Sequence, residues 1–291
     1  MQFTKFTGLA KKLPSPLYKL AAQAYIDQEF PRHIFLETTA NCNLSCEYCP
    51  REKIKEDMSF DLFKEIVDEC SKYGARSFSL HLFGEPLLYP KIIEAIRYIK
   101  QRNRRHTILL TTNGTLLNRF ANELLGCKVD RIIWSWRKNN FNSNTIEVLK
   151  KIGMVRLLIE ETPKEEFEKW SKFPRIEVKH LHNYGGQIDT TKWGIKEVDS
   201  DERYPCYHLW LAPAIRWNGD ITICCNDPNG AEGQGKYSTS NNLHSFWSSD
   251  KLRRIRNSHM VGQYRGLCVG CNSYKAYPDI FFGFQKHKHV A

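Results

Sequence analysis

The sequence predicts an α/β fold built on a parallel sheet. Between Ile34 and Leu181, short apolar runs alternate with longer amphipathic runs, and about six such pairs follow one another. This alternation is typical of β-α units whose strands lie parallel. After Leu181 the alternation stops, and the remaining sequence is rich in Gly, Asn, Ser, Trp and Cys. The sequence therefore predicts a second, less regular region behind the β-α units.

Each β-α unit can be placed by its apolar run. We expect strands at residues 34–38, 77–82, 107–111, 131–136, 155–160 and 176–181. We expect the helices between them to begin near Phe60, Lys91, Asn118, Ser143 and Pro163. The 36 residues from Cys49 to Glu85 suit one crossover helix and a returning strand.

The first of these helices illustrates the periodicity. Ser59 can serve as its N-cap, and apolar side chains then recur at helical spacing at Leu62, Phe63, Ile66, Val67 and Cys70. Cys70 therefore faces the core. Cys127 has no ligand-like neighbour, so we expect it to be a small buried side chain as well.

Composition argues against two classes of protein. No stretch approaches about 18 uncharged apolar residues, and the lysine-containing first twenty residues have no continuous apolar core. Neither a membrane span nor a secretory signal is predicted. Ten cysteines, several of them clustered, indicate metal binding in a reducing compartment more than a disulfide framework. We therefore expect a cytoplasmic protein.

The formal net charge of +11 allows nucleic acid as a partner. The basic runs are interrupted by Tyr, Ile and Leu, a pattern that fits solvated helix faces. Nucleic-acid binding is thus possible but not indicated.

Three cysteines share one short loop. Cys42, Cys46 and Cys49 have C-x3-C-x2-C spacing, and Tyr48 stands directly before the third thiol. Three thiolates can hold three irons of a 4Fe-4S cube and leave the fourth iron without a protein ligand. That open iron would be a binding site.

Two further polar turns are expected beside this loop. Gly84-Glu85-Pro86 follows the second predicted strand, and Thr112-Asn113-Gly114 follows the third. Parallel strands place their carboxyl ends on one rim of a sheet, where the loops bind ligands. The three turns should therefore converge.

The spacing of Cys42, Cys46, Tyr48 and Cys49, followed by Gly84-Glu85-Pro86, resembles the radical S-adenosylmethionine (SAM) superfamily. The resemblance implies a partial (β/α)6 TIM-like barrel followed by a small irregular α+β cluster-binding domain. It also implies that the open iron chelates the methionine part of SAM, and that the turn formed by Gly84, Glu85 and Pro86 binds the amino group. Phe83 stands where the family usually has a first glycine.

The resemblance assigns three more SAM-binding residues. Tyr48 would pack near adenine, Asn113 would belong to the turn after the third strand, and Ser135 would lie near the ribose. Thr112-Asn113-Gly114 is also an ordinary turn sequence. The surroundings of Ser135 depart from the family pattern, so Trp136, Arg137 and Lys138 become candidates for a substrate-facing rim.

A second set of cysteines follows in the less regular region. The layout of this set resembles the twitch domain, a short form of the SPASM extension that holds an auxiliary 4Fe-4S cluster. The set consists of Cys206, Cys224, Cys268 and Cys271, with Gly219 five positions before Cys224. Cys225 is an alternative to Cys224, although alternation along an extended strand favours Cys224. Zinc is the alternative to iron and sulfur at any site of four cysteines.

The expected organisation has three parts. Residues 1–30 would be an N-terminal extension, residues 31–190 the radical SAM partial barrel, and residues 191–291 the twitch-like auxiliary domain. The expected cofactors are two 4Fe-4S clusters, one that binds SAM and one auxiliary, together with SAM itself.

The resemblance implies an enzyme that reductively cleaves SAM to a 5'-deoxyadenosyl radical and removes hydrogen from a substrate. An auxiliary cluster with four protein ligands suits electron transfer, so we expect oxidation of a small molecule such as a sugar alcohol. Peptide crosslinking or epimerisation, RNA modification and a noncatalytic metal-binding scaffold remain alternatives.

The expected partners are a small-molecule or peptide substrate and an external one-electron donor such as flavodoxin or ferredoxin. Four side chains are candidates for a base or substrate anchor, namely His182, His208, Arg137 and Arg216. The sequence singles out none of them, so no catalytic residue is assigned.

Overall fold

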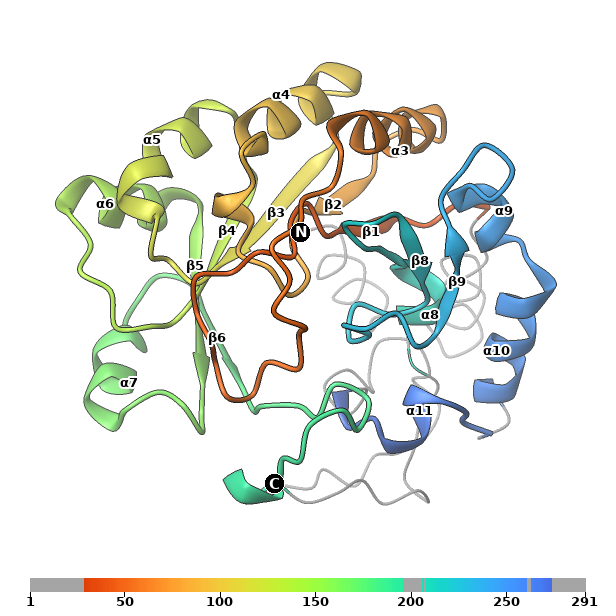
Figure 1. The fold of residues 1–291 in the computed structure, drawn as a ribbon. Helices are drawn as coiled ribbons and strands as arrows, with labels where there is room; N and C mark the ends of the chain where they lie inside the picture. The colour runs from red at the N-terminus through yellow and green to blue at the C-terminus, as the bar shows by residue number, and fades with distance from the viewer. Residues whose placement is uncertain (1–28, 196–205, 207, 261–262, 274–291) are drawn as a thin grey trace, which may run out of the picture.

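The computed structural model describes residues 29–195, 206, 208–260 and 263–273 (Figure 1). The expected N-terminal extension therefore lies outside the described residues, apart from its last two positions. Within these ranges, no helix has both the length and the apolar character that crossing a membrane would require.

The described residues form one nine-stranded sheet in the order β6-β5-β4-β3-β2-β1-β7-β8-β9. Its first six strands are parallel. They are β1 (His33–Leu36), β2 (Ser77–Ser79), β3 (Thr107–Thr112), β4 (Arg131–Ser135), β5 (Gly153–Leu158) and β6 (Ile176–Lys179). The sheet stays open between β6 and β9, so the expected partial barrel is confirmed.

Helices connect successive parallel strands and lie on the outer side of the curved sheet (Figure 1). They are α3 (Phe60–Lys72), α4 (Ile92–Arg102), α5 (Leu117–Gly126), α6 (Ser143–Ile152) and α7 (Lys164–Trp170), with the short 3-10 helix η1 (Pro86–Leu88) before α4. All five begin within one residue of the expected positions. The strands begin within two residues of expectation and mostly end earlier, because the chain leaves the sheet to form the loops of the rim.

Helix α3 forms as its sequence pattern predicts. The Ser59 hydroxyl accepts a hydrogen bond from the Leu62 amide at 3.2 Å and caps the helix. The apolar face of α3 is buried, and the Cys70 side chain is fully excluded from solvent. Cys127 is also buried in the same core. Both cysteines are therefore packing residues, as expected.

The second region continues the same sheet. β1 pairs in parallel with β7 (Ala214–Ile215), and β8 (Asp220–Thr222) pairs antiparallel with both β7 and β9 (Gly233–Lys236). The region also contains more helix than its sequence pattern suggested, at α8 (His208–Leu211), α9 (Leu243–Trp247), α10 (Asp250–Met260) and α11 (Leu267–Gly270). The division of the chain near residue 190 stays a prediction.

Glu37 joins the two regions at the end of β1. Its carboxylate accepts weak hydrogen bonds of 3.4 Å from the backbone amides of Phe83 and Trp217, and the Arg216 guanidinium lies 3.9 Å away. The Glu37 side chain is almost fully buried. Burial raises the pKa of Glu37 to about 7, and the charge of Arg216 only partly opposes that rise.

The raised pKa of Glu37 predicts a pH dependence of stability. Between the ordinary value of 4.5 and about 7, the folded protein holds a proton that the unfolded chain releases. The stability that protonated Glu37 contributes to the folded protein is complete below pH 4.5. It is lost as the pH rises through about 7. Glu37→Gln should therefore lose less stability than the wild type between pH 5 and 7, by up to about 1.4 kcal/mol per pH unit.

Urea unfolding of both proteins across this pH range measures the difference. Glu56→Gln removes a carboxylate from an exposed position and serves as the control. Parallel pH profiles for wild type and Glu37→Gln would contradict the assignment.

Candidate functional site

The loop of residues 42–49 begins shortly after β1 and folds around one arginine. The Arg51 guanidinium donates to the carbonyl oxygens of Cys42 at 3.3 Å and Leu44 at 3.0 Å. The Cys49 amide also donates to the Cys46 carbonyl at 3.1 Å. These bonds hold the loop closed while the three thiols stay partly exposed. The loop is therefore shaped to present its sulfur atoms on one side.

The thiols face a cavity of about 1400 Å³ at the carboxyl ends of the parallel strands. Ligand pockets in proteins usually measure roughly 300–1,000 Å³, so this cavity has room for a cofactor and a substrate together. Most of the predicted residues of the N-terminal site line it, namely Cys42, Cys46, Cys49, Tyr48, Gly84, Glu85, Asn113 and Ser135. Pro86 is buried instead, at the start of η1.

The second turn lies directly against the cysteine loop. The Glu85 amide donates to the Asn41 carbonyl at 2.8 Å. A Cβ atom on Gly84 would overlap the carbonyl oxygen of Thr39. Only glycine therefore allows this close approach. The contact brings Glu85 beside the thiols.

The Glu85 carboxylate is buried and held by three donors. It accepts from the Thr112 hydroxyl at 2.7 Å, the Asn113 amide at 2.8 Å and the Leu87 amide at 3.2 Å. Burial raises the pKa of Glu85, and the donors partly offset that rise. The third turn is thus bound to the second. It is more than an ordinary surface turn.

Two donors approach the thiols from neighbouring strands. The Asn113 side-chain nitrogen Nδ2 lies 3.9 Å from the Cys42 sulfur, and the Arg137 guanidinium lies 3.4 Å from the Cys46 sulfur. The same guanidinium lies over the Tyr48 ring, 5.3 Å from its centre. Donors of this kind can hydrogen-bond the sulfur ligands of an iron-sulfur cluster.

Arg137 is the one member of the predicted substrate-facing rim that lines the cavity. Trp136 is buried, and its indole donates to Glu166 at 3.3 Å. Lys138 is exposed and lies outside the cavity lining. Among the candidate base or anchor residues, His182 and His208 line the cavity, whereas Arg216 is buried next to Glu37.

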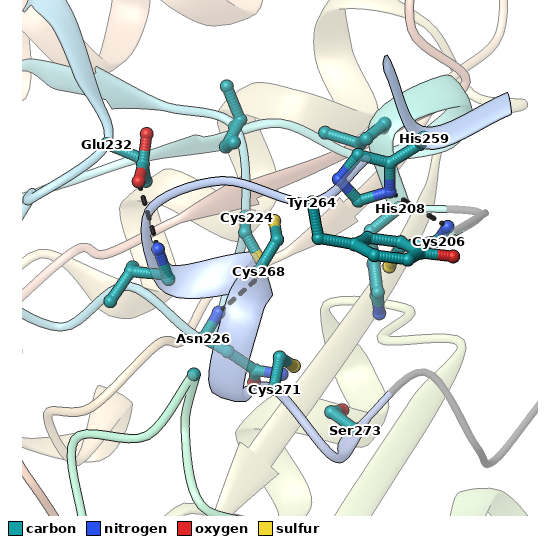
Figure 2. A pocket seen from close by; sticks show the side chains of 14 residues that line it. Cys206, His208, Cys224, Asn226, Glu232, His259, Tyr264, Cys268, Cys271 and Ser273 are labelled. Atoms are coloured by element: carbon teal, nitrogen blue, oxygen red, sulfur yellow. Dashed lines mark hydrogen bonds between the residues drawn. The ribbon is translucent and has the colours of Figure 1, made fainter. Parts of the chain in front are cut away.

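The cysteines of the second region line a separate, smaller pocket. Figure 2 shows Cys206, Cys224, Cys268 and Cys271 gathered around it. Burial raises the pKa of the Cys206 thiol well above its usual range, and the three other thiols act in the same direction. The Asn226 amide donates to the Cys224 sulfur at 3.3 Å. The structure thus places four partly buried thiols, from three separate segments of the sequence, around one space.

The Cys225 thiol contacts the Cys224 thiol, but the two residues line different spaces. Cys225 lines the large cavity and is absent from the lining of the small pocket, whereas Cys224 lines the small pocket. This arrangement supports Cys224 as the ligand. Three residues line both the large cavity and the small pocket, namely His208, Asn226 and Ser273. Only one layer of side chains therefore separates the two spaces.

A loop after β6 holds the small pocket together. Asn183 and Asn272 exchange hydrogen bonds of 2.9 Å and 3.2 Å between backbone amides and side-chain oxygens. Gln187 donates to the Asn226 carbonyl at 3.3 Å and accepts from Asn229 at 3.2 Å. The loop therefore fastens both halves of the four-cysteine pocket.

Sequence reasoning also missed the polar residues inside the sheet. His33, Arg156, Glu177 and Lys179 line the cavity from strands β1, β5 and β6. The sequence did contain a signal for these four residues, because each of them alternates with apolar residues along its strand. Such alternation usually places the polar side chain toward solvent. Here it places the polar side chain toward the cavity.

Residues 36–135 match the family model described as the Radical SAM superfamily. A Tungsten-containing aldehyde ferredoxin oxidoreductase cofactor-modifying protein from Pyrococcus furiosus is 25% identical over 178 residues, which cover 60% of this chain and 48% of that protein. A Probable GTP 3',8-cyclase from Methanococcus maripaludis is 38% identical over 105 residues, or 35% of each chain. The chain thus spans less than half the length of these relatives.

Solved structures share the fold. BtrN in complex with AdoMet and 2-DOIA has a TM-score of 0.63 and 19% identity, covering 83% of this chain and 92% of that one. SuiB of Streptococcus suis bound to its precursor peptide SuiA has a TM-score of 0.61 and 16% identity, covering 91% and 76%.

The superfamily implies SAM and one 4Fe-4S cluster, and the three-thiol loop, the Glu85 turn and the large cavity fit both groups. Residues 36–135 therefore form a radical SAM domain.

Proposed function

We propose that this chain is a radical SAM enzyme that oxidises a small molecule, such as a sugar alcohol, by removing hydrogen. The observation that carries the proposal is the single layer of side chains between the large cavity and the four-cysteine pocket. A substrate in the cavity would lie next to an electron acceptor in the pocket. Net oxidation requires such an acceptor.

Different residues of the large cavity would bind the cluster and SAM. Cys42, Cys46 and Cys49 would hold a 4Fe-4S cluster with one open iron, and Glu85 would receive the amino group of SAM. When bound, these groups supply the 5'-deoxyadenosyl radical that removes a hydrogen atom from the substrate. The protein itself holds the Glu85 carboxylate in place and surrounds the thiols with donors.

We propose that Cys206, Cys224, Cys268 and Cys271 hold an auxiliary 4Fe-4S cluster that accepts the electron. Zinc suits these thiols less well. Among the residues that the structure describes, no three His, Cys, Asp or Glu side chains are spaced to share a single ion. Zinc would draw its thiolates to about 2.3 Å from one centre, whereas a cluster holds its ligands further apart.

The proposal includes a division of the chain and an electron source. Residues 31–190 would form the SAM-binding part and residues 191–291 the auxiliary part, joined by the pairing of β1 with β7. An external donor such as flavodoxin or ferredoxin would reduce the first cluster, as befits a cytoplasmic enzyme.

Peptide modification, by crosslinking or epimerisation, is the second candidate. SuiB bound to its precursor peptide SuiA shares the fold over 91% of this chain. The present cavity is also larger than the cofactor alone needs. Incubation with SAM, a reductant and a panel of sugar alcohols or peptides tests both candidates, because only the true substrate class should couple 5'-deoxyadenosine formation to a new product.

The first prediction concerns the open iron. Cys46→Ala should abolish 5'-deoxyadenosine formation from SAM, because the cluster loses one of three anchors. Chromatography of reduced, anaerobically reconstituted protein measures the product. Cys127→Ala, which removes a thiol outside both pockets, should retain formation. Equal activity of Cys46→Ala and wild type would refute the loop assignment.

The second prediction separates two neighbouring thiols. Reconstituted wild type should carry about eight irons. Cys224→Ala and Cys206→Ala should each lose about half of them and still cleave SAM. Cys225→Ala is the matched control and should keep the full complement. Full iron in Cys224→Ala with half in Cys225→Ala would reverse the assignment, and full iron in Cys206→Ala would remove Cys206 from the site.

A further inference from the structure

Arg137 contacts the cysteine loop although it follows the fourth strand of the sheet. Its Nη2 atom lies 3.4 Å from the Cys46 sulfur, and the two residues are 91 positions apart. Strands β2 and β3 separate β1, which leads into the loop, from β4, which leads into Arg137. The loop therefore reaches across the rim of the sheet, and Arg137 meets it there.

The Arg137 guanidinium is held in this position by its neighbours. Its Nη1 atom donates to the Trp136 carbonyl, and its central carbon lies over the Tyr48 ring, 5.3 Å from the ring centre. Trp136 is itself fixed, because its side chain is buried and its indole donates to Glu166 at 3.3 Å. The guanidinium is thus already oriented toward the Cys46 sulfur by the fold.

The positive charge of Arg137 is not paired with a carboxylate within the described ranges. The loop's own carboxylate, Glu47, pairs with Lys192 instead. Glu85, the buried carboxylate of the neighbouring turn, accepts its three hydrogen bonds from other donors. The sulfur of Cys46 is therefore the group that faces this charge.

The surroundings of the contact are largely apolar. Cys46 packs against a small cluster formed by Tyr48, Leu158 and Leu181. Charges act more strongly on one another where water is excluded. A hydrogen bond from a charged donor is also stronger than one from a neutral donor. The contact between Arg137 and Cys46 therefore has the features of a strong interaction.

Asn113 makes a weaker contact of the same kind. Its Nδ2 atom lies 3.9 Å from the Cys42 sulfur and also donates to the Asn43 side chain at 2.9 Å. The donor is neutral, more distant and shared with a second acceptor. Arg137 should therefore have the larger effect on the sulfur ligands.

We propose that Arg137 raises the reduction potential of the cluster held by Cys42, Cys46 and Cys49. Net charge and hydrogen bonds to the sulfur ligands are among the factors that set the potential of an iron-sulfur cluster. Reduction transfers one electron from the external one-electron donor and makes the cluster more negative by one unit. The guanidinium favours this more negative state through the Cys46 sulfur, so Arg137 is a positioning residue. This inference rests on the proposed function, because it concerns the cluster of that same site.

Redox titration followed by electron paramagnetic resonance tests the inference without substrate and without SAM. The parent protein is the whole chain with Cys206→Ala, so that the signal comes from the N-terminal cluster. At the potential where half of the parent's cluster is reduced, Arg137→Met should show a ratio of reduced to oxidised cluster about tenfold lower. For a one-electron couple this ratio corresponds to a midpoint potential lower by about 59 mV.

Two further substitutions show what the shift depends on. Arg137→Lys keeps the charge but loses the planar fork, so its ratio should fall between those of the parent and Arg137→Met. Arg119→Met is the matched control. The Arg119 guanidinium also lies over an aromatic ring, that of Phe120 at 5.1 Å, but it belongs to α5 and lines neither cavity. Its ratio should equal that of the parent.

Iron content shows whether each variant has formed its cluster. An unchanged ratio in iron-loaded Arg137→Met would overturn the inference and leave the proposed function intact. If Arg137→Met binds no iron, an unchanged ratio in Arg137→Lys would overturn the inference in the same way, and a lowered ratio would support it. Absence of 5'-deoxyadenosine formation by a wild type that holds its cluster would instead count against the proposed function alone.

Discussion

The pairing of β1 with β2 on one side and with β7 on the other determines where both cysteine groups lie. The three-thiol loop follows β1, so it is set between the Glu85 turn after β2 and the hairpin that ends at Cys224. Glu37, at the end of β1, contacts the backbone of both neighbours. A single strand thus fixes the spacing between the three-thiol loop and the four-cysteine pocket.

Hydrogen bonds refine what the sheet positions. The Asn41 carbonyl and Gly84 bring the second turn against the cysteine loop, and Glu85 then fastens the third turn through the Asn113 amide. On the far side, Asn183 fastens the last cysteine loop to the loop after β6. Each bond joins segments that the sheet alone would leave independent. The chemistry therefore depends on loops whose positions are held from several directions.

The features that could be predicted from the sequence are local ones. The spacing of Cys42, Cys46 and Cys49 lies within eight positions, and the apolar periodicity of α3 lies within thirteen residues. Both are set by neighbouring residues, so they can be recognised without knowing the fold. The order of the six parallel strands followed from the regular alternation of units, because successive β-α units usually lie side by side.

The features that could not be predicted depend on contacts between distant residues. Nothing near Asn183 indicates that it will bond Asn272, 89 positions later. Trp136 sits beside Arg137 and looked equally suited to the rim, but Glu166 and the core of the outer helices enclose it. Arg156 has the alternation of a solvent-facing residue and faces the cavity only because the sheet curves around it.

The account depends on one iron that the three-thiol loop leaves open. Electron paramagnetic resonance of the reduced, oxygen-protected protein, recorded before and after addition of SAM, tests it most directly. The account predicts that SAM changes the signal of the N-terminal cluster, because the open iron gains a ligand, and that this change is absent from the Cys42→Ala protein. A cluster signal that SAM leaves unaltered in the wild type would contradict it.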